Sequence, residues 1–519
     1  MNEKLLKKAF QFHQSNQLNK AKQIYLKLLK IDESNFNILT LLGTVEYQLG
    51  MLDKAITLLR KSIHINNNQF IAHQNIGIVY SKKLNYDEAI FHLNYAIKIN
   101  SSYYHLYNEL GNIYLQKNNY QEALSFFDKA LNINPNYSEA LNNRGICYRR
   151  LKKIDKALKD FDKAIFHNKN YAEAYLNYAN CQKDLGLFSD AEIGYKKAIS
   201  FKKNYFAAKY NLSILYLYQG NFKKGWLNYG MRWHDINKPA FTKYIPTCKK
   251  INGINNLLLW GEQGIGDQII FCSMLKELDY IEKITVAIDE RLIPILKRSY
   301  KEIKFINILN IDKTNLFDFQ LPLADLGSFL RKSRNSFLSQ PNFFLKPNYK
   351  KSSNFIKKIA SKKPICGISW KSKNLVFGQA KSLNLKELYP ILKKENYTFV
   401  DLQYGDTTKE KDKMRKDFNI EIASIETLDK FNDLDGLISL INICDVVISC
   451  CNVTAHLAGA LGKKTYLMVP YGLGSLWYWH GEVYSYWYPS VQLLKQRKIN
   501  NWNSVIKFIE AELKYESKF

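Results

Sequence analysis

Small and apolar residues recur in the first half of the chain with a constant period of 34 residues. One column of this pattern is occupied by Ala9, Gly43, Gly77, Gly111, Gly145, Ala179 and Ser213. A second column of small residues runs from Ala21 to Gly225 at the same spacing. Within one unit, LGNIYLQKNNYQEALSFFDKALNINPNYSEALNN, the apolar positions follow the period of two amphipathic helices.

A small residue at a fixed place in every unit predicts a point where two helices cross, because a larger side chain would hold their backbones apart. The pattern therefore predicts about seven helix–turn–helix units over residues 1–235, stacked into an α-solenoid with a concave surface. The unit resembles the tetratricopeptide repeat, which implies a protein partner on the concave face. A spacer or dimerisation module without a ligand of its own remains open. Asp160 and Asp162, flanked by lysines, are interpreted as exposed helix charges.

The hydrophobic pattern changes at about residue 256, where short apolar runs begin to alternate with helix-like segments. NLLLW, ITVAID, KFINI and FDFQLPL precede a proline-containing break at 340–364, and ICGISW, TFVDLQ, DVVISC and TYLMVP follow it. This alternation predicts parallel sheets with covering helices. We expect a linker at 236–255, two α/β domains at 256–345 and 346–500, and a C-terminal helix at 501–519.

Composition narrows the class of protein. A net charge of +28 would favour binding to nucleic acid. The lysines of the chain are scattered rather than concentrated, however, so we expect no nucleic-acid partner. The eight cysteines form no Cys-x-x-Cys pair, which favours reduced thiols. No apolar run is long enough for a signal peptide or a transmembrane segment, so a cytoplasmic location is expected.

The stretch WGEQGIGDQ (260–268) places three glycines directly after a predicted strand. It is not a P-loop, because no Gly-Lys-Ser/Thr follows, and it is not a Gly-x-Gly-x-x-Gly turn, because its glycines stand at positions 261, 264 and 266. Its glycines allow a tight turn and close approach to a ligand. Asp267 then has two interpretations: a cap at the start of a helix, or a carboxylate that takes a proton from an acceptor hydroxyl.

A second candidate loop lies in DVVISCCNVTAHLAGALG, where a strand ends near Cys450 and a helix starts near Thr454. Free backbone N–H groups at such a helix start favour phosphate. His456 is either a packed core histidine or a residue of the site. Asp433 and Asp435 form an Asp-x-Asp string, which we interpret as a helix cap, and we expect no metal.

Together, the two loops carry a resemblance to a known family. Residues 256–500 resemble the bacterial heptosyltransferase-like glycosyltransferases, and specifically those preceded by tetratricopeptide repeats. The resemblance lies in GIGD with its apolar helix, GISWK (367–371), KSLNL (381–385), AHLAGALG (455–462) and the aromatic tail from Trp477. It implies the GT-B fold, in which two Rossmann-like domains face a cleft, with the acceptor on the first domain and the nucleotide-sugar on the second.

The resemblance also implies roles for individual residues. Asp267 corresponds to the general base, and Gly264 and Gly266 belong to the acceptor-side loop. The nucleotide-sugar would be bound by Lys371, Lys381, Ser382, Cys451, Asn452, Thr454 and His456. Many members of the family have aspartate where this chain has Cys451, and a thiol cannot replace a carboxylate that holds a sugar hydroxyl.

The expected function is metal-independent, inverting transfer of a sugar from a nucleotide-sugar, with no other cofactor, to a hydroxyl of a protein or glycan acceptor. The repeats would recruit the protein acceptor or a partner. A non-catalytic repeat scaffold with a degenerate transferase domain is the main alternative. A nucleic-acid binder and a protein O-linked sugar transferase also remain open.

Overall fold

The computed structural model describes residues 2–234, 238–311, 317–374, 378–472, 474–499 and 501–515. Residues 236 and 237 of the expected linker and 516–519 of the expected C-terminal helix lie outside these ranges. The chain forms two compact units, Met1–Cys181 and Gln182–Phe519.

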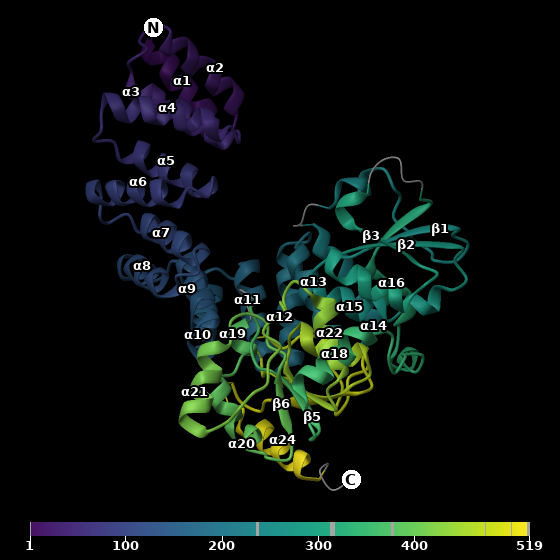
Figure 1. Ribbon diagram of the computed structural model, residues 1–519. Coiled ribbons are helices and arrows are strands. Elements are labelled where there is room, and N and C mark those ends of the chain that lie inside the picture. Colours follow the sequence, from purple (N-terminus) through teal and green to yellow (C-terminus); the bar gives the residue numbers. More distant parts are fainter. Residues whose placement is uncertain are drawn as a thin grey trace. The chain divides into compact units, whose positions relative to one another are not determined.

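The first unit is a series of antiparallel helix pairs (Figure 1). Its helices are α1 (Asn2–Gln14), α2 (Leu18–Leu29), α3 (Phe36–Gln48), α4 (Leu52–Ile65), α5 (Phe70–Lys82), α6 (Tyr86–Ile99), α7 (Tyr104–Gln116), α8 (Tyr120–Ile133), α9 (Ser138–Arg150) and α10 (Ile154–His167). Helix α11 (Ala172–Asp184) crosses the boundary between the units. Each helix is too short to be stable alone, so the pairs depend on their mutual packing.

The glycine column lies where the two helices of a pair cross, as the repeat pattern predicts. A Cβ atom on Gly111 would lie 2.5 Å from the ring of Phe127, and one on Gly145 would lie 2.7 Å from Phe161. Gly43 and Gly77 meet Leu59 and Leu93 in the same way, at 2.8 Å. A side chain at these positions would overlap the facing helix, which explains why only small residues occur there.

Asp160 is buried, so its interpretation as an exposed charge was wrong. It is 4% exposed and lies on the apolar stripe of α10, three residues after Ala157 and one before Phe161. The Arg144 guanidinium donates two hydrogen bonds of 2.7 Å to its carboxylate and a third of 2.7 Å to Asp128. The charge is tolerated inside because this bidentate pairing satisfies it.

The second unit begins with the end of the repeat array, helices α12 (Phe188–Phe201), α13 (Phe206–Tyr218) and α14 (Phe222–Leu227). The last helix is short, and the 3₁₀ helix η1 (Tyr229–Trp233) follows it. The Trp226 indole fills the space over Gly327 and donates a 2.7 Å hydrogen bond to the Arg331 carbonyl. The aromatic end of the array therefore packs on the sheet-containing region, as its composition suggests.

A parallel sheet follows, with the strand order β3-β2-β1-β4 among the described residues. Its strands are β1 (Asn256–Trp260), β2 (Lys283–Ile288), β3 (Lys304–Asn307) and β4 (Phe319–Pro322). Helices α15 (Ile265–Cys272), α16 (Ile293–Ser299) and α17 (Leu326–Leu330) lie between and after them. Strands β1, β2 and β4 are nearly continuous runs of buried residues, because both faces of a parallel sheet are covered, whereas the edge strand β3 is only partly buried.

The segment expected to be a linker packs closely on this sheet in its described part. Its 3₁₀ helix η2 (Ala240–Lys243) contributes Phe241, which with Ile245 covers the face that carries Leu258 and Trp260. The chain then runs beside β4, where the Cys248 N–H donates a 2.9 Å hydrogen bond to the Gln320 carbonyl.

The second parallel sheet has the strand order β6-β5-β7-β8-β9 among the described residues. Its strands are β5 (Ile365–Ser369), β6 (Thr398–Asp401), β7 (Val446–Cys450), β8 (Lys464–Val469) and β9 (Val491–Lys495). Its helices are α18 (Tyr349–Ile359), α19 (Gly378–Lys381), α20 (Tyr389–Leu392), α21 (Thr408–Phe418), α22 (Leu434–Asn442), α23 (Val453–Ala460) and α24 (Asn503–Tyr515). Helix α18 lies inside the segment interpreted as a break.

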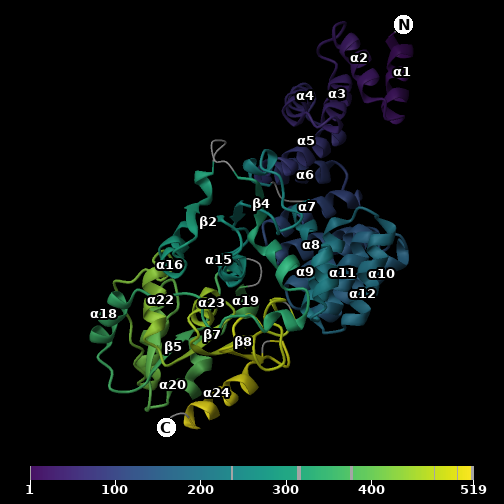
Figure 2. The ribbon, with the colours of Figure 1, turned by 90° about the vertical axis from the view of Figure 1, so that its right-hand side faces the viewer.

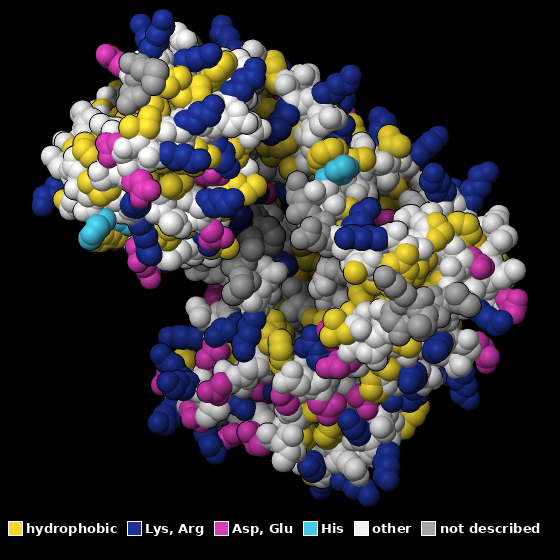
Figure 3. Space-filling view, turned by 90° about the horizontal axis from the view of Figure 1, so that it is seen from above, with side chains coloured by type: hydrophobic (Ala, Val, Ile, Leu, Met, Phe, Trp, Pro, Cys, Tyr) yellow, Lys and Arg dark blue, Asp and Glu magenta, His cyan; other side chains and the backbone are white. Residues whose placement is uncertain are grey.

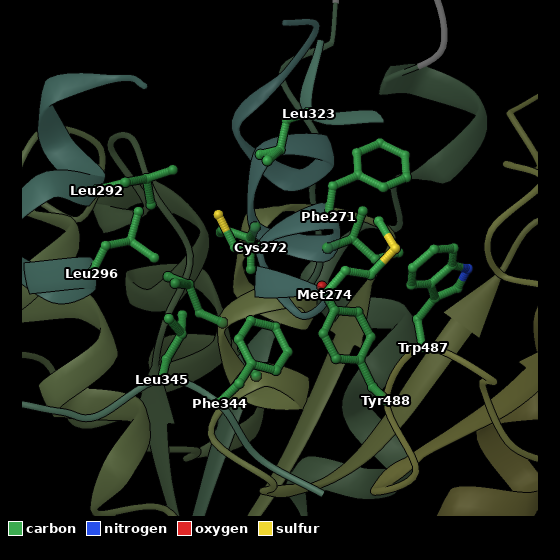
Figure 4. Packing of buried hydrophobic residues seen from close by; sticks show 14 of the residues in the cluster. Phe271, Cys272, Met274, Leu292, Leu296, Leu323, Phe344, Leu345, Trp487 and Tyr488 are labelled. Atoms are coloured by element: carbon green, nitrogen blue, oxygen red, sulfur yellow. The ribbon is translucent and has the colours of Figure 1, made fainter. Parts of the chain in front are cut away.

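Alternate residues of the second sheet belong to different cores. Ile448 and Met468 pack with Val505 and Ile509 of α24, which lies next to α20 in Figure 2. Val447 and its neighbours on the opposite face join a larger core with α22, α23 and the first sheet. Figure 4 shows Phe271 and Met274, from the region of α15, beside Trp487 and Tyr488. The two sheets therefore share one hydrophobic core.

Candidate functional site

Both candidate loops lie at places where the strand order reverses. The glycine turn follows β1, whose neighbours are β2 on one side and β4 on the other. The second loop follows β7, which pairs with β5 after the chain has left β5 for β6. In open parallel sheets, ligands bind outside the carboxyl ends of strands at such reversals. Topology alone makes these two loops the preferred place for a ligand.

Asp267 lies in the first turn of α15 and is partly exposed. Its carboxylate accepts a 3.2 Å hydrogen bond from the Gly264 N–H, so it does cap the helix. Burial raises the pKa of Asp267 to about 6, while this backbone hydrogen bond and the Lys381 cation lower it. The side chain is therefore ionised at neutral pH but takes up a proton readily, as a general base requires.

Lys381 lies at the end of α19 and is 4% exposed. Across the described part of the chain, neither a hydrogen bond nor an ion pair involves its ammonium group. Burial lowers the pKa of Lys381, and Asp267, Cys450 and Cys451 are among the groups that oppose this. A buried cation without a partner is costly, so a ligand anion is the expected compensation.

Lys371 and Ser382 make their polar contacts with groups other than Lys381. The Lys371 ammonium donates a 2.6 Å hydrogen bond to Glu410 and is 41% exposed. The Ser382 hydroxyl donates to the Gly378 carbonyl at 2.7 Å and accepts from the Ser372 N–H at 3.0 Å. Both residues border the loop after β5, and in this structure their polar atoms hold that loop together.

Asn452 joins the ends of the two central strands. Its side-chain oxygen caps α23 by accepting from the Thr454 N–H at 3.0 Å. Its amide nitrogen donates to the Ser369 hydroxyl at 2.7 Å and to the Lys371 carbonyl at 3.0 Å. Thr454 is fully buried beneath this turn. The contacts of Asn452 and Thr454 therefore hold the start of α23 in position.

Cys451 is a neutral, buried thiol at this position. It is 3% exposed and donates a weak 3.5 Å hydrogen bond to the Met468 carbonyl. Burial raises the pKa of the Cys451 thiol to about 12, despite the nearby Lys381 cation. The side chain therefore supplies no negative charge to neutralise Lys381.

His456 and Gly266 form the contact between α15 and α23. A Cβ atom on Gly266 would lie 2.6 Å from the His456 ring, so only glycine allows this approach. His456 is 3% exposed, its Nδ1 lies 3.0 Å from the Tyr488 hydroxyl, and the Trp479 ring lies 4.7 Å away in a tilted arrangement. Burial lowers the pKa of His456 to about 3, so the ring is neutral. These contacts agree with a packed structural histidine.

Sequence reasoning missed an ionic cluster behind the glycine turn. Arg232 of η1 pairs with Glu262 through two guanidinium nitrogens and with Asp325 at 2.7 Å. Burial raises the pKa of Glu262 to about 7, although Arg232 opposes this. Glu262 stands within the quoted turn, and Arg232 in the atypical last repeat. Only their pairing, which joins residues 30 positions apart, was invisible in the sequence.

The Asp-x-Asp string is a helix cap with cationic neighbours. The Asp433 side chain accepts a 2.7 Å hydrogen bond from the Gly436 N–H. Lys351 lies 3.2 Å from both Asp433 and Asp435, and Arg298 binds Asp435. Across the described residues, no group of three or more histidine, cysteine, aspartate or glutamate side chains could hold a metal ion.

Two properties of the described residues concern partners. Lysine and arginine side chains are spread among acidic and neutral ones on the face seen in Figure 3, without forming a continuous block. None of the helices in the described ranges combines the length and apolarity needed to cross a bilayer.

A family model supports the repeats, and parts of the chain are similar to two solved structures. A family model for the tetratricopeptide repeat matches residues 103–165, which confirms that predicted unit. A crystal structure of MamA is 25% identical, with a TM-score of 0.30, and covers 32% of this chain and 96% of that one. A tetratricopeptide repeat protein from Parabacteroides merdae is 19% identical, with a TM-score of 0.41, and covers 47% of this chain and 96% of that one.

A relative outside the solved structures is Protein FlbA of Caulobacter vibrioides. It is 26% identical over 322 residues, which are 57% of this chain and 53% of FlbA. The chain thus spans about half the length of this relative. The chain therefore contains tetratricopeptide repeats, and a region of parallel sheets follows them.

Proposed function

We propose that this protein is a glycosyltransferase of GT-B architecture that moves a sugar from a nucleotide-sugar to an acceptor hydroxyl. The observation that carries the proposal is the unpartnered Lys381, buried next to Cys451 and the start of α23, with Asp267 within its electrostatic reach. An anionic diphosphate at Lys381 and a hydroxyl at Asp267 would satisfy both groups.

The reaction follows from these two groups. Asp267 accepts the proton of the acceptor hydroxyl, and the oxygen of that hydroxyl bonds to the anomeric carbon of the donor sugar. The bond between that carbon and the diphosphate breaks, and the electron pair leaves on the nucleoside diphosphate. Lys381 and the N-terminus of α23 stabilise the charge that develops there, so the scheme needs no metal ion. Attack opposite the leaving group inverts the anomeric centre.

The repeats supply the second half of the proposal, because a protein-interaction scaffold in the same chain can recruit a protein acceptor or partner. Recruitment raises the effective concentration of the acceptor at the second unit without any new contact there.

The test measures binding and transfer separately on the full chain. Thermal unfolding with UDP, GDP, ADP, CMP and dTDP at millimolar concentration identifies the nucleotide, since saturation at a hundred times Kd adds about 2.7 kcal/mol. Asp267→Asn should keep that shift and lower transfer by about 10²–10⁴-fold. The matched variant Asp279→Asn, at an exposed aspartate, should leave both unchanged. Full transfer by Asp267→Asn would eliminate its role as base.

The pH profile gives an independent test. Because burial raises the pKa of Asp267 to about 6, kcat/KM should fall by about tenfold per pH unit below that value. A profile that stays level down to the usual range of a surface carboxylate would contradict the assignment.

A non-catalytic scaffold is favoured by one observation, the neutral Cys451 thiol where the resembling family has a carboxylate. On that alternative, no nucleotide of the panel shifts the unfolding midpoint, and Lys381→Met leaves every interaction of the protein unchanged.

A further inference from the structure

The aromatic tail that begins at Trp477 has no role in the mechanism described so far. Several of its side chains are buried in the core shared by the two sheets, namely Trp477, Tyr478, Trp479, Trp487 and Tyr488. The Trp487 ring lies 5.7 Å from the ring of Phe271 on α15, measured between centroids. The Tyr478 ring lies 5.4 Å from that of His456 on α23. The tail therefore packs against both helices that follow the candidate loops.

Tyr478 differs from the other polar groups of this tail because its hydroxyl is unused and still accessible. The Tyr488 hydroxyl lies 3.0 Å from the His456 Nδ1. The indole nitrogens of Trp479 and Trp487 have no acceptor among the described residues, but they are sealed inside the protein. Tyr478 is 5% exposed and its hydroxyl makes no hydrogen bond to any described residue, yet its oxygen is not sealed in this way. A buried polar group without a partner is costly, so a ligand is the expected partner.

Tyr478 lies at the contact between α15 and α23. Its ring meets the His456 ring in a T-shaped arrangement, and a Cβ atom on Gly266 of α15 would lie 2.6 Å from the same histidine. Burial raises the pKa of Tyr478 well above its usual value, and the Asp267 carboxylate and the Cys451 thiol add to this. The phenol is therefore a neutral hydroxyl within electrostatic reach of both the proposed base and the loop that precedes α23.

The proposed reaction places the transferred sugar between the two candidate loops, because its anomeric carbon must lie between the acceptor hydroxyl at Asp267 and the diphosphate at Lys381. Cys451 offers this sugar little, since its thiol already makes a weak hydrogen bond to the Met468 carbonyl. The Tyr478 hydroxyl can both donate and accept a hydrogen bond, as a sugar hydroxyl can. A phosphate oxygen would instead prefer the Lys381 cation, because charge-assisted hydrogen bonds are stronger.

We propose that Tyr478 hydrogen bonds to a hydroxyl of the sugar being transferred and thereby helps to select that sugar. The inference rests on the proposed function and adds a specificity-determining residue to it. It also gives the aromatic tail a direct role in the site. A site that hydrogen bonds one substrate hydroxyl discriminates against the analogue that lacks it, so one hydroxyl of the sugar should matter more than the others.

The experiment compares the full chain with Tyr478→Phe, which removes only the hydroxyl. The probes are the nucleotide identified by the unfolding panel and its glucose, galactose, mannose and N-acetylglucosamine conjugates, whose Kd values are measured by calorimetric titration. The variant should bind the bare nucleotide as the wild type does and the tightest conjugate about three- to tenfold more weakly. Its unfolding midpoint without ligand should be unchanged or higher, because the lost hydroxyl has no partner among the described residues. A hydroxyl with a purely structural role would lower that midpoint instead.

Tyr25→Phe is the matched control, because it removes the hydroxyl of another buried tyrosine without a described partner and should leave both Kd values unchanged. A second set of probes consists of analogues of the tightest conjugate that each lack one sugar hydroxyl. The wild type should bind one analogue about three- to tenfold more weakly than the parent conjugate, and Tyr478→Phe should bind these two equally.

Equal affinity of wild type and Tyr478→Phe for the tightest conjugate would overturn the inference, as would an equal loss of affinity for conjugate and bare nucleotide. Either result leaves the nucleotide-induced shift of the unfolding midpoint in place and rejects only the role of Tyr478. If no nucleotide of the panel shifts the midpoint of the wild type, the transferase itself is rejected and the inference with it.

Discussion

Arg144 of the first unit and Lys381 of the second are both cations in the interior, yet their surroundings differ. Arg144 makes three hydrogen bonds to Asp128 and Asp160, and its side chain is 19% exposed. Lys381 is 4% exposed, and no partner for it occurs in the described ranges. A buried charge with partners is stabilised by the fold around it. A buried charge without partners instead indicates a ligand or a functional role.

The histidines show that burial alone is not the criterion. His73 and His92 of the first unit lie with their Nδ1 atoms 3.0 Å apart, and His456 of the second contacts the Tyr488 hydroxyl. Burial lowers the pKa of His92 to about 4 and that of His456 to about 3, so both rings are neutral. All three have partners, and we assign them to the structure.

Breaking the paired cation should have the largest effect on stability. Arg144→Ala leaves Asp160 buried without its partner, which should cost about 3–5 kcal/mol. Because repeats are stabilised mainly by their neighbours, the loss should be concentrated in α8, α9 and α10. Hydrogen exchange of the amides in these helices measures it. Lys159→Ala, at an exposed lysine of α10, is the control and should stay within about 0.5 kcal/mol.

The next largest effect should be a loss of stability of the first unit in acid. Burial is the main cause of the low pKa of His92, and His73 and Arg60 add to it. A depressed pKa means that stability is complete above the unfolded value near 6.5 and is lost as the pH falls from there through about 4. At about 1.4 kcal/mol per pKa unit, the difference between 6.5 and about 4 corresponds to a loss of roughly 3.5 kcal/mol.

Hydrogen exchange of α5 and α6 between pH 7 and 4 measures this loss. His92→Gln removes the titrating ring and should flatten the dependence. An unchanged slope in that variant would assign the acid sensitivity to other groups, of which Glu88, 3.7 Å from His92, is the first to examine.

Removing the unpaired cation should not lower stability, in contrast to removing the paired one. Lys381→Met should leave the unfolding midpoint unchanged or raised, because an uncompensated charge leaves the interior. The same variant should weaken nucleotide binding by at least about tenfold, or 1.4 kcal/mol. Calorimetric titration with the nucleotide found in the panel measures the second effect. A stable protein with unaltered affinity would remove Lys381 from the donor site.

Lys371 should show the smallest effect, although the resemblance groups it with Lys381. Its pairing with Glu410 is partly exposed, and such pairs contribute about 0.2–1 kcal/mol. Lys371→Met should therefore change both unfolding and nucleotide affinity little. A loss of affinity as large as that of Lys381→Met would mean that Lys371 leaves Glu410 to bind the donor.

Much of the fold could be predicted because its signals are local. The period of 34 residues places the glycines at helix crossings, and eight apolar runs correspond to β1–β8 within a residue or two. Strand β9 was missed, since VQLLK stands in an aromatic tail without an alternating pattern. Helix α21 was missed as well, because TKEKDKMRKDF is almost entirely polar.

The site was predictable only in part. The sequence identified both loops, because each joins a strand to a helix with residues suited to a turn. It did not separate Lys381 from Lys371 and Ser382, since similar polar side chains close together in the chain differ only in what surrounds them. It also hid the burial of Asp160, although the spacing from Ala157 to Phe161 places that residue on the apolar stripe.

The sequence by itself determined the repeats, the alternation of strands and helices, and the two turns, because these depend on the spacing of apolar, small and glycine residues along one segment. Only the tertiary structure decided which charges are paired. Arg232 meets Glu262, Arg144 meets Asp160, and Lys381 meets neither Asp267 nor any other described partner. Pairing depends on distances and burial set by segments far apart in the chain, and those quantities exist only once the chain has folded.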